Sequence, residues 1–282
     1  MKKLIAIIAL LLGAVFSFSH QPSRAWVAQL PGCSQSAAFL ARVAAQDGTH
    51  TAAYQNLICG LVSDGVWSKL DDLHILAAAD SATALTNLVS SCCGASAVNS
   101  PTFSADHGYT GNGTSSYINT GYNPTSVGGN YTQNSASFGV YVLTGRTSGA
   151  DYCEIGVTNV AMNSADFFPW AADGNTYAEV NANDSAHAAS VVKGMWVLTR
   201  TGASAVATRH NGSSFSTSTT ASVATIGANF FLFAKNNAGS AIYFSADQIS
   251  AYFGGGGLTS TQMDAVASRI NGYMTALGIN VY

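Results

Sequence analysis

The stretch Tyr109-Thr-Gly-Asn-Gly-Thr-Ser-Ser-Tyr-Ile-Asn-Thr-Gly121 decides the fold of this chain. The segment Gly111-Asn-Gly113 adopts φ > 0 at little cost, so it predicts a reversal of the chain. A strand is predicted to follow over residues 115–120, with its even-numbered side chains on one face and its odd-numbered side chains on the other. The stretch therefore predicts a turn that delivers a strand into a sheet.

The rest of the chain beyond residue 95 repeats this pattern of short strands and turns. A brief apolar run over residues 73–77 is suited to a buried strand ahead of it. The other candidate strands cover residues 96–99, 102–104, 115–120, 136–143, 152–158, 176–181, 190–201, 203–210, 230–235 and 241–253. Many short strands separated by Gly and Asn turns predict a mainly β sandwich or barrel, and they argue against a βαβ fold.

Helical periodicity is concentrated at the two ends of the chain. Residues 34–46 are predicted to form one helix, and a second is predicted to start at Thr49 or Thr51 and to end near residue 64, before a short helical turn within residues 66–73. Residues 80–89 fit either a short helix or an irregular loop. The N-terminal helical segment is therefore expected to occupy residues 26–70.

The C-terminal helix is the best-defined element of the sequence. Thr259 and Gln262 fit a capping box, an apolar stripe runs from Met263 to Leu277, and Gly278 is suited to end the helix. The stripe must be buried, so a helix over residues 259–277 is predicted to pack on the sandwich or against the N-terminal helices. The sandwich and this helix together are expected to span residues 71–282.

The N-terminus has the pattern of an export signal. Lys2 and Lys3 precede an apolar run over residues 4–18, and Ala25 offers a cleavage end, so residues 1–25 are predicted to be a signal peptide. The alternative is an uncleaved membrane anchor, although the run is short against the roughly 20 residues that span a bilayer. Lipidation at Cys33 is disfavoured by Arg24 and the polar segment between this cysteine and the apolar run. We expect a secreted or cell-envelope protein, with a virion protein as the alternative.

The composition excludes one class of partner. Only 9% of the residues are charged, and the 11 Lys and Arg residues are scattered, so the chain cannot build a basic stripe for nucleic acid. Membrane contact is expected only through the signal or anchor segment. A homo-oligomer is compatible with the sequence.

The cysteines fit structural roles rather than a metal site. Export permits disulfides among Cys33, Cys59, Cys92, Cys93 and Cys153, but the sequence leaves the pairing open. The vicinal Cys92 and Cys93 cannot easily bond to one another, so each would need a distant partner, and one thiol of the five must stay odd. No Cys/His spacing matches a zinc site.

Catalytic patterns are missing from the sequence. A glycosidase of this architecture would carry two acids at i, i+2 or i+4 of one strand, and neither Glu154 nor Glu179 has such a partner, while Asp151 and Glu154 fall on opposite faces. There is no Gly-x-Ser-x-Gly turn, and Arg200, Arg209 and His210 are a poor match to a lyase site. We therefore predict that the chain is not an enzyme and has no catalytic residues.

One stretch suits sugar binding. Residues 167–177 combine aromatic and polar side chains around a turn, and we predict Trp170, Asp173, Asn175 and Tyr177 as carbohydrate-binding residues. No cofactor is predicted. The oxygens of Asn181, Asn183 and Asp184 offer ligands to Ca²⁺, although a plain hairpin turn explains them equally well.

Four motifs, taken in chain order, resemble concanavalin A-like (LamG-type) jelly-roll domains. They are the run 73–77, the turn Gly111-Asn-Gly113 with Tyr117 and Ile118, the strand Trp196-Val-Leu-Thr-Arg200 with its Asn211-Gly212 hairpin, and the strand Ile249-Ser-Ala-Tyr-Phe253 with the glycines that follow it. The resemblance covers roughly residues 72–277. It implies a two-sheet jelly-roll sandwich of the lectin and glucanase type.

The resemblance also guides the expectation of function. The whole chain looks like proteins from phage and prophage tail regions, but the signal peptide departs from these and favours export. We expect a non-catalytic extracellular module that recognises a carbohydrate or a cell-surface partner. The alternatives are a structural subunit of a phage tail, virion or envelope assembly that contacts virion proteins, and, third, a polysaccharide-cleaving enzyme.

Overall fold

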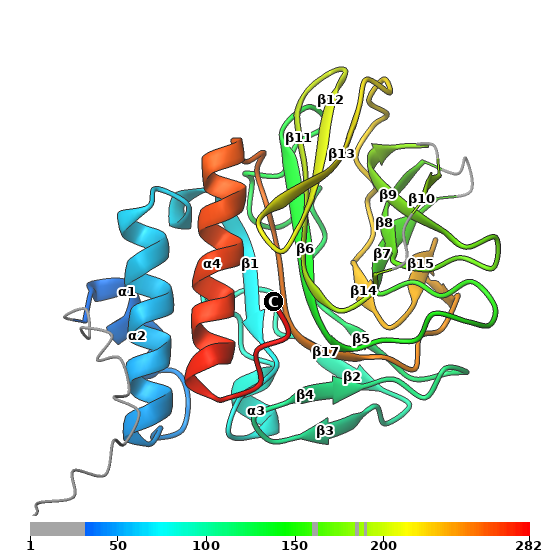
Figure 1. Ribbon diagram of the computed structural model, residues 1–282. Coiled ribbons are helices and arrows are strands. Elements are labelled where there is room, and N and C mark those ends of the chain that lie inside the picture. Colours follow the sequence, from blue (N-terminus) through cyan, green and yellow to red (C-terminus); the bar gives the residue numbers. More distant parts are fainter. Residues whose placement is uncertain (1–31, 160–162, 184–185, 189–190) are drawn as a thin grey trace, which may run out of the picture.

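The protein is mainly β, with two stacked sheets and a layer of helices on one side (Figure 1). The computed structural model describes residues 32–159, 163–183, 186–188 and 191–282, so the predicted signal peptide lies outside the described residues. The predicted β-sandwich with short N-terminal helices and a C-terminal helix packed on it is confirmed. Its assignment to the concanavalin A-like family stays a prediction. Within the described ranges, no helix is long and apolar enough to cross a membrane.

The helical elements are α1 (Ser34–Leu40), α2 (Gly48–Ser63), the short 3₁₀ helix η1 (Trp67–Lys69), α3 (Ser81–Ala84) and α4 (Ser260–Ala276). The helix predicted over residues 34–46 is too long. The chain turns away after Leu40, and the Arg42 guanidinium then donates to the carbonyls of residues 87, 88 and 90. Asp47, rather than Thr49 or Thr51, caps α2, because its carboxylate accepts the backbone N–H of His50 at 2.9 Å.

The first sheet has eight strands: β1 (Leu70–Ile75), β3 (Thr102–Ser104), β4 (Gly108–Thr110), β6 (Ala136–Thr144), β11 (Gly194–Gly202), β12 (Ala205–His210), β13 (Ser213–Ser218) and β17 (Gln248–Gly255). Their order is β13-β12-β11-β6-β17-β4-β3, and β1 pairs with β17. The centre of this sheet is buried on both faces. In β6, Phe138 and Val140 pack between the sheets, whereas Tyr141 and Leu143 pack against the helices.

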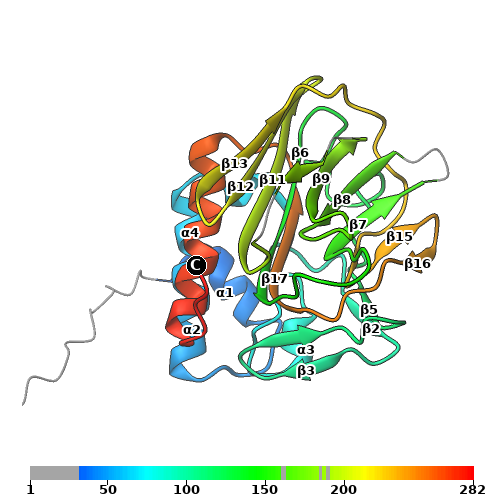
Figure 2. The ribbon, with the colours of Figure 1, turned by 45° about the vertical axis from the view of Figure 1, so that its right-hand side comes forward.

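The second sheet has nine strands: β2 (Ser96–Val98), β5 (Tyr117–Asn119), β7 (Ile155–Thr158), β8 (Ser164–Phe168), β9 (Asn175–Ala182), β10 (His187–Ala188), β14 (Phe231–Leu232), β15 (Lys235–Asn237) and β16 (Ser240–Ile242). It follows the order β10-β9-β8-β7-β14-β5-β2, with β15 pairing with both β7 and β16. Strands β7, β8 and β9 lie on the side of the molecule away from α2 and α4 (Figures 1 and 2). Among the helices that the structure describes, none covers the outer face of this sheet.

The glycine turn behaves as its sequence predicts. Gly113 has φ +72°, and the Asn112 side-chain oxygen accepts the backbone N–H groups of residues 114, 115 and 116 at 2.8–2.9 Å. A Cβ on Gly111 would lie 2.1 Å from the carbonyl oxygen of Ser245, so the turn packs too closely for any other residue. In β5, Ile118 is buried between the sheets, as the alternation requires.

The helix α4 buries the stripe that the sequence predicts. Its capping box is formed by Thr259 and Gln262, and Gly278 takes φ +75° beyond its end. Met263, Val266 and Ile270 belong to a second apolar core, which lies between the helices and the first sheet. The helix packs both on the sandwich and against α2, so both expected partners are present.

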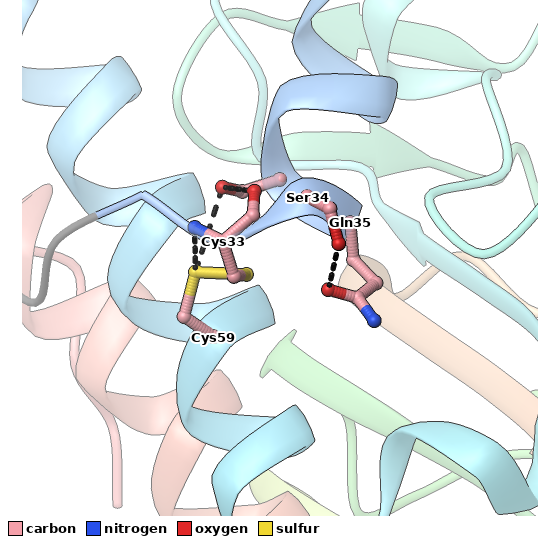
Figure 3. The surroundings of a disulfide bond; sticks show 5 residues. Cys33, Ser34, Gln35 and Cys59 are labelled. Atoms are coloured by element: carbon pink, nitrogen blue, oxygen red, sulfur yellow. Dashed lines mark hydrogen bonds between the residues drawn. A yellow bond between two sulfur atoms is a disulfide. The ribbon is translucent and has the colours of Figure 1, made fainter.

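One disulfide, Cys33–Cys59, ties the start of α1 to α2 (Figure 3). The backbone N–H of Cys33 also approaches the sulfur of Cys59 at 2.9 Å, and Ser36 donates to the carbonyl of Cys33. Cys92, Cys93 and Cys153 are free thiols in the described chain. The sequence left the pairing open, and the structure pairs Cys33 with Cys59 and leaves the vicinal Cys92 and Cys93 as thiols.

Candidate functional site

A pocket of about 380 Å³ opens on the outer face of the second sheet. Strands β8, β9 and β15 supply its floor, and the segments around residues 151, 171–173 and 243 supply its rim. Four acids, one lysine and three aromatic rings line it. The acids are Asp151, Asp166, Asp173 and Glu179, and the rings are Phe168, Tyr177 and Tyr243.

Strand alternation aims these side chains outward. In β9, Ala178 and Val180 face the core between the sheets, so Tyr177 and Glu179 face the pocket. In β8, the same rule turns Phe167 inward and its neighbours outward. The antiparallel register then sets Asp166 directly opposite Glu179, and Phe168 directly opposite Tyr177. The floor of the pocket thus consists of one carboxylate pair beside one aromatic pair.

A buried ion pair crosses the floor from β15 to β8. The ammonium of Lys235 lies 2.6 Å from the Oδ2 atom of Asp166, whose side chain is 1% exposed. Gly156 of β7 is the register partner of both residues, and a Cβ there would lie 2.7 Å from the Cβ of Asp166. The missing side chain at Gly156 therefore leaves the space that the lysine crosses.

Burial and charge act in opposite directions on this pair. Burial raises the pKa of Asp166 above its ordinary value, and the nearby Lys235 limits the rise. For Lys235, burial acts to lower the pKa, but the carboxylate of Asp166 outweighs it and raises the pKa. The lysine therefore stays protonated, and its charge is committed to Asp166.

The rim is fixed by hydrogen bonds within the turn between β8 and β9. Asp173 accepts the backbone N–H of Asn175 at 3.0 Å and the hydroxyl of Tyr177 at 2.8 Å. A hydrogen bond from the side chain of Asn175 is the main reason that the pKa of Asp173 is lowered. Asp151 accepts the backbone N–H of Ala172 at 2.7 Å from outside the turn. Both rim carboxylates are thus anchored by hydrogen bonds.

Tyr243 completes the aromatic part of the site. Its ring is 44% exposed and meets the ring of Phe168 edge-on, with centroids 5.3 Å apart. Tyr243 also has φ +56°, a conformation that is costly for a residue with a bulky side chain. The ring is therefore held at the rim by the backbone rather than by burial.

The predicted sugar-binding residues divide into two groups. Asp173 and Tyr177 line the pocket, and Asn175 orients Asp173. Trp170 is absent from the pocket lining; it is half-buried, packs against the core between the sheets, and forms an isolated bridge with Tyr152. The four residues are neighbours in sequence, but the turn points one of them away.

Of the residues that offer oxygens to Ca²⁺, Asn181 is committed to other partners. Asn181 is buried, its amide donates to the carbonyls of Thr132 and Gln133, and its oxygen accepts the hydroxyl of Tyr131. Asn183 is exposed, and Asp184 lies outside the described residues. In the part of the chain that the structure describes, no group of three or more His, Cys, Asp or Glu side chains is arranged to hold a metal ion.

The sequence reasoning missed Asp166, Phe168, Lys235 and Tyr243, and it assigned Glu179 no role. Strand β8 (Ser164–Phe168) was not predicted, so its outward residues had no place in a sheet. A hairpin across the turn at Asp173 could have been predicted from the sequence. Every second residue in 164–168 and in 175–182 is polar or aromatic, which indicates two paired strands with one face turned outward. Lys235 belongs to β15, which is distant in sequence from β8 and β9, so its place in the pocket could be found only from the fold.

A second hollow, of about 830 Å³, lies between α2 and α4. Its lining is mostly small and apolar, and its one charged lining residue, Arg269, is bound to Asp64 at 2.7 Å. It offers few converging polar groups. The pocket on the second sheet is therefore the better candidate for a ligand site.

Comparison with known proteins gives a shared fold. No protein-family model matches the chain, and no curated protein matches it. The chain is similar to a mutant of Trypanosoma rangeli sialidase that displays trans-sialidase activity, with a TM-score of 0.53 and 10% identity over 81% of this chain and 39% of that chain. It is also similar to domain 4 of AbnA, a GH43 extracellular arabinanase from Geobacillus stearothermophilus in complex with arabinotriose, with a TM-score of 0.43 and 13% identity over 71% of this chain and 98% of that chain. The chain thus spans about two fifths of the sialidase.

This likeness corrects the prediction that the chain is not an enzyme. The solved structure that shares its fold at a TM-score of 0.53 is a sialidase, so the fold does not support the absence of catalysis. Two acids can also meet from different strands, which the spacing of acids along one strand does not test. Asp166 and Glu179 face one another from two neighbouring strands.

Proposed function

We propose that this protein binds a carbohydrate in the pocket on the outer face of the second sheet. The observation that carries the proposal is the pairing of aromatic and carboxylate side chains on the pocket floor, Phe168 with Tyr177 and Asp166 with Glu179. Sugar rings have apolar C–H faces that pack on aromatic rings, and hydroxyl groups that donate to carboxylates. A pocket with both kinds of group side by side suits a saccharide better than a purely apolar ligand.

We expect Tyr177→Ala to weaken glycan binding about tenfold, which corresponds to ~1.4 kcal/mol of lost aromatic contact and hydrogen bonding. Binding is first found on a glycan array and then measured by titration calorimetry. Tyr282→Ala is the control, because Tyr282 is a tyrosine, 43% exposed, that is outside the pocket lining. Equal affinity of Tyr177→Ala and the wild type would contradict the proposed site.

A second candidate function is cleavage of a glycosidic bond in the same pocket. It is favoured by the carboxyl pair Asp166 and Glu179, in which burial keeps the pKa of Asp166 raised while Glu179 is half-buried in the pocket. Glycoside hydrolysis requires two carboxyl groups of this kind, one acting as an acid and the other as a base or nucleophile. Their different environments would separate these roles.

We expect Glu179→Gln to abolish the release of reducing ends from any polysaccharide that the wild type cleaves, with a loss of at least about a hundredfold. Glycan binding by Glu179→Gln should persist. Asp264→Asn is the control, since Asp264 lies on α4 and pairs with Arg209. A wild-type protein that binds glycans but releases no reducing ends from them would leave binding as the function.

Export is the setting that we propose for both functions, with the glycan as the partner. The predicted signal peptide and the low charge of the chain support it. A structural subunit of a virion or envelope assembly, and a homo-oligomer, stay predictions. Ordered assembly of the purified protein without any glycan binding would favour the structural role.

A further inference from the structure

More acidic than basic side chains line the pocket, and this excess of acids bears on which carbohydrate the pocket binds. Three carboxylates, those of Asp151, Asp173 and Glu179, line the pocket in addition to Asp166. The carboxylate of Asp173 accepts the hydroxyl of Tyr177 at 2.8 Å. The hydrogen bond to Asp173 raises the pKa of Tyr177, and the negative charges of Asp173, Asp151 and Glu179 add to this rise.

The positive charge of the pocket is already neutralised. Lys235 is the one cation among the lining residues, and its ammonium lies 2.6 Å from Asp166. Arg146 is engaged elsewhere, with its guanidinium 4.2 Å from the ring centroid of Tyr152 and a hydrogen bond to the carbonyl of Phe244. The pocket therefore presents a net negative charge beside its aromatic floor.

We infer that the pocket selects saccharides that carry a free amino group, that is, cationic amino sugars, over neutral and acidic ones. This inference rests on the proposed carbohydrate binding at the same pocket. A protonated sugar amine has three donors, which suits a pocket lined by several carboxylates. It is also attracted to the faces of aromatic rings, and Tyr177 and Tyr243 supply two at the rim.

The same charges act against other sugars. An N-acetylated amino sugar has no positive charge and gains no ionic attraction from the carboxylates that line the pocket. A sugar acid brings a carboxylate close to Asp151, Asp173 and Glu179, and like charges at short distance repel. The expected order of affinity is therefore amino sugar, neutral sugar, sugar acid.

The test compares three oligosaccharide series on the full chain by titration calorimetry. The probes are oligomers of glucosamine, N-acetylglucosamine and galacturonic acid of the same length, at a pH below the pKa of the sugar amine. At low salt we expect the glucosamine oligomer to bind about tenfold more tightly than the acetylated one. At about 1 M salt, where the screening length falls to about 3 Å, this preference should shrink severalfold.

Two variants identify the carboxylates responsible. Asp151→Asn and Glu179→Gln should each reduce the preference for the glucosamine oligomer severalfold, because the affinity for the glucosamine oligomer falls more than the affinity for the acetylated oligomer. Asp264→Asn, which removes a carboxylate outside the pocket, should change neither affinity. Circular dichroism of each variant verifies folding.

The outcomes separate this inference from the proposed function. Equal binding of the glucosamine and acetylated oligomers, or tighter binding of the galacturonic acid oligomer, would overturn the inference and leave carbohydrate binding intact. A preference for glucosamine that survives both pocket substitutions would also overturn it. Failure of all three series to bind, together with a blank glycan array, would overturn the inference and the proposed function together.

Discussion

Arg200→Ala should lower the free energy of unfolding by about 4 kcal/mol, because it leaves several buried acceptors without their donor. Arg200 is fully buried in β11, and its guanidinium donates to the carbonyls of Val180, Gly202, Ala203 and Thr220 at 2.7–3.2 Å. Val180 belongs to the second sheet, so this one side chain joins the two sheets directly. The loss should appear as a lower midpoint in urea denaturation.

Two further variants make this result specific. Arg200→Lys should recover little of the stability, since an ammonium cannot reach four carbonyls with the planar geometry of a guanidinium. Arg209→Ala, which removes an arginine from the neighbouring β12 whose side chain is 19% exposed, should cost less than about 1 kcal/mol. If Arg200→Ala and Arg209→Ala were equally mild, the guanidinium would not be the link between the sheets.

Removal of the disulfide by the double substitution Cys33→Ala, Cys59→Ala is expected to lower the free energy of unfolding by about 3 kcal/mol. The bond joins residues 26 apart in sequence and restricts the unfolded chain accordingly. It also holds α1 against α2, which packs on α4, so its loss should be felt in the helix layer. The measurement is urea denaturation with and without a reductant.

The reductant supplies the control for this prediction. Reducing agent should destabilise the wild type by the same amount as the double substitution and should leave the substituted protein unchanged. Cys92, Cys93 and Cys153 are already free, so they add no reductant-dependent effect. A wild type that is insensitive to reductant would show that the bond contributes nothing to stability.

The fold was largely predictable because alternation and turn residues act locally. Residues 136–143 predict β6 to within one residue, and the capping box and Gly278 predict α4. Strand β13 was missed because residues 213–218 are serine-rich and lie at the edge of the first sheet, where one face needs no apolar side chains. The last residues of α1 were wrongly added because the contacts that end it, those of Arg42 with residues 87–90, are distant in sequence.

The site was predictable only where it is local. Asp173 and Tyr177 stand four residues apart around one turn, so their composition alone singled them out. Asp166 and Lys235 meet because β8 and β15 both flank β7 at Gly156, a register that no short-range pattern specifies. Trp170 belongs to the same stretch of sequence but packs against the core between the sheets and is outside the pocket lining, and its role in sugar binding stays a prediction.

Glu154 illustrates why acids were hard to read from the sequence. It is fully buried and accepts a hydrogen bond from Ser245 at 2.9 Å, and burial raises its pKa well above the ordinary value. Asp247, also buried, raises it further. Glu154 is therefore part of the protein interior, whereas Glu179 is half-buried and lines the pocket. The residues next to the two glutamates in sequence do not reveal this difference.

The helix layer makes the molecule one-sided, and this has a practical consequence for how it is handled. Gly272 of α4 has open space at its Cβ position, so a cysteine or a tag placed there would be tolerated on the side covered by helices. Coupled to a bead or a sensor chip through that position, the protein would turn its second sheet outward (Figure 2). Random coupling through the exposed Lys69 and Lys193 would not fix this orientation.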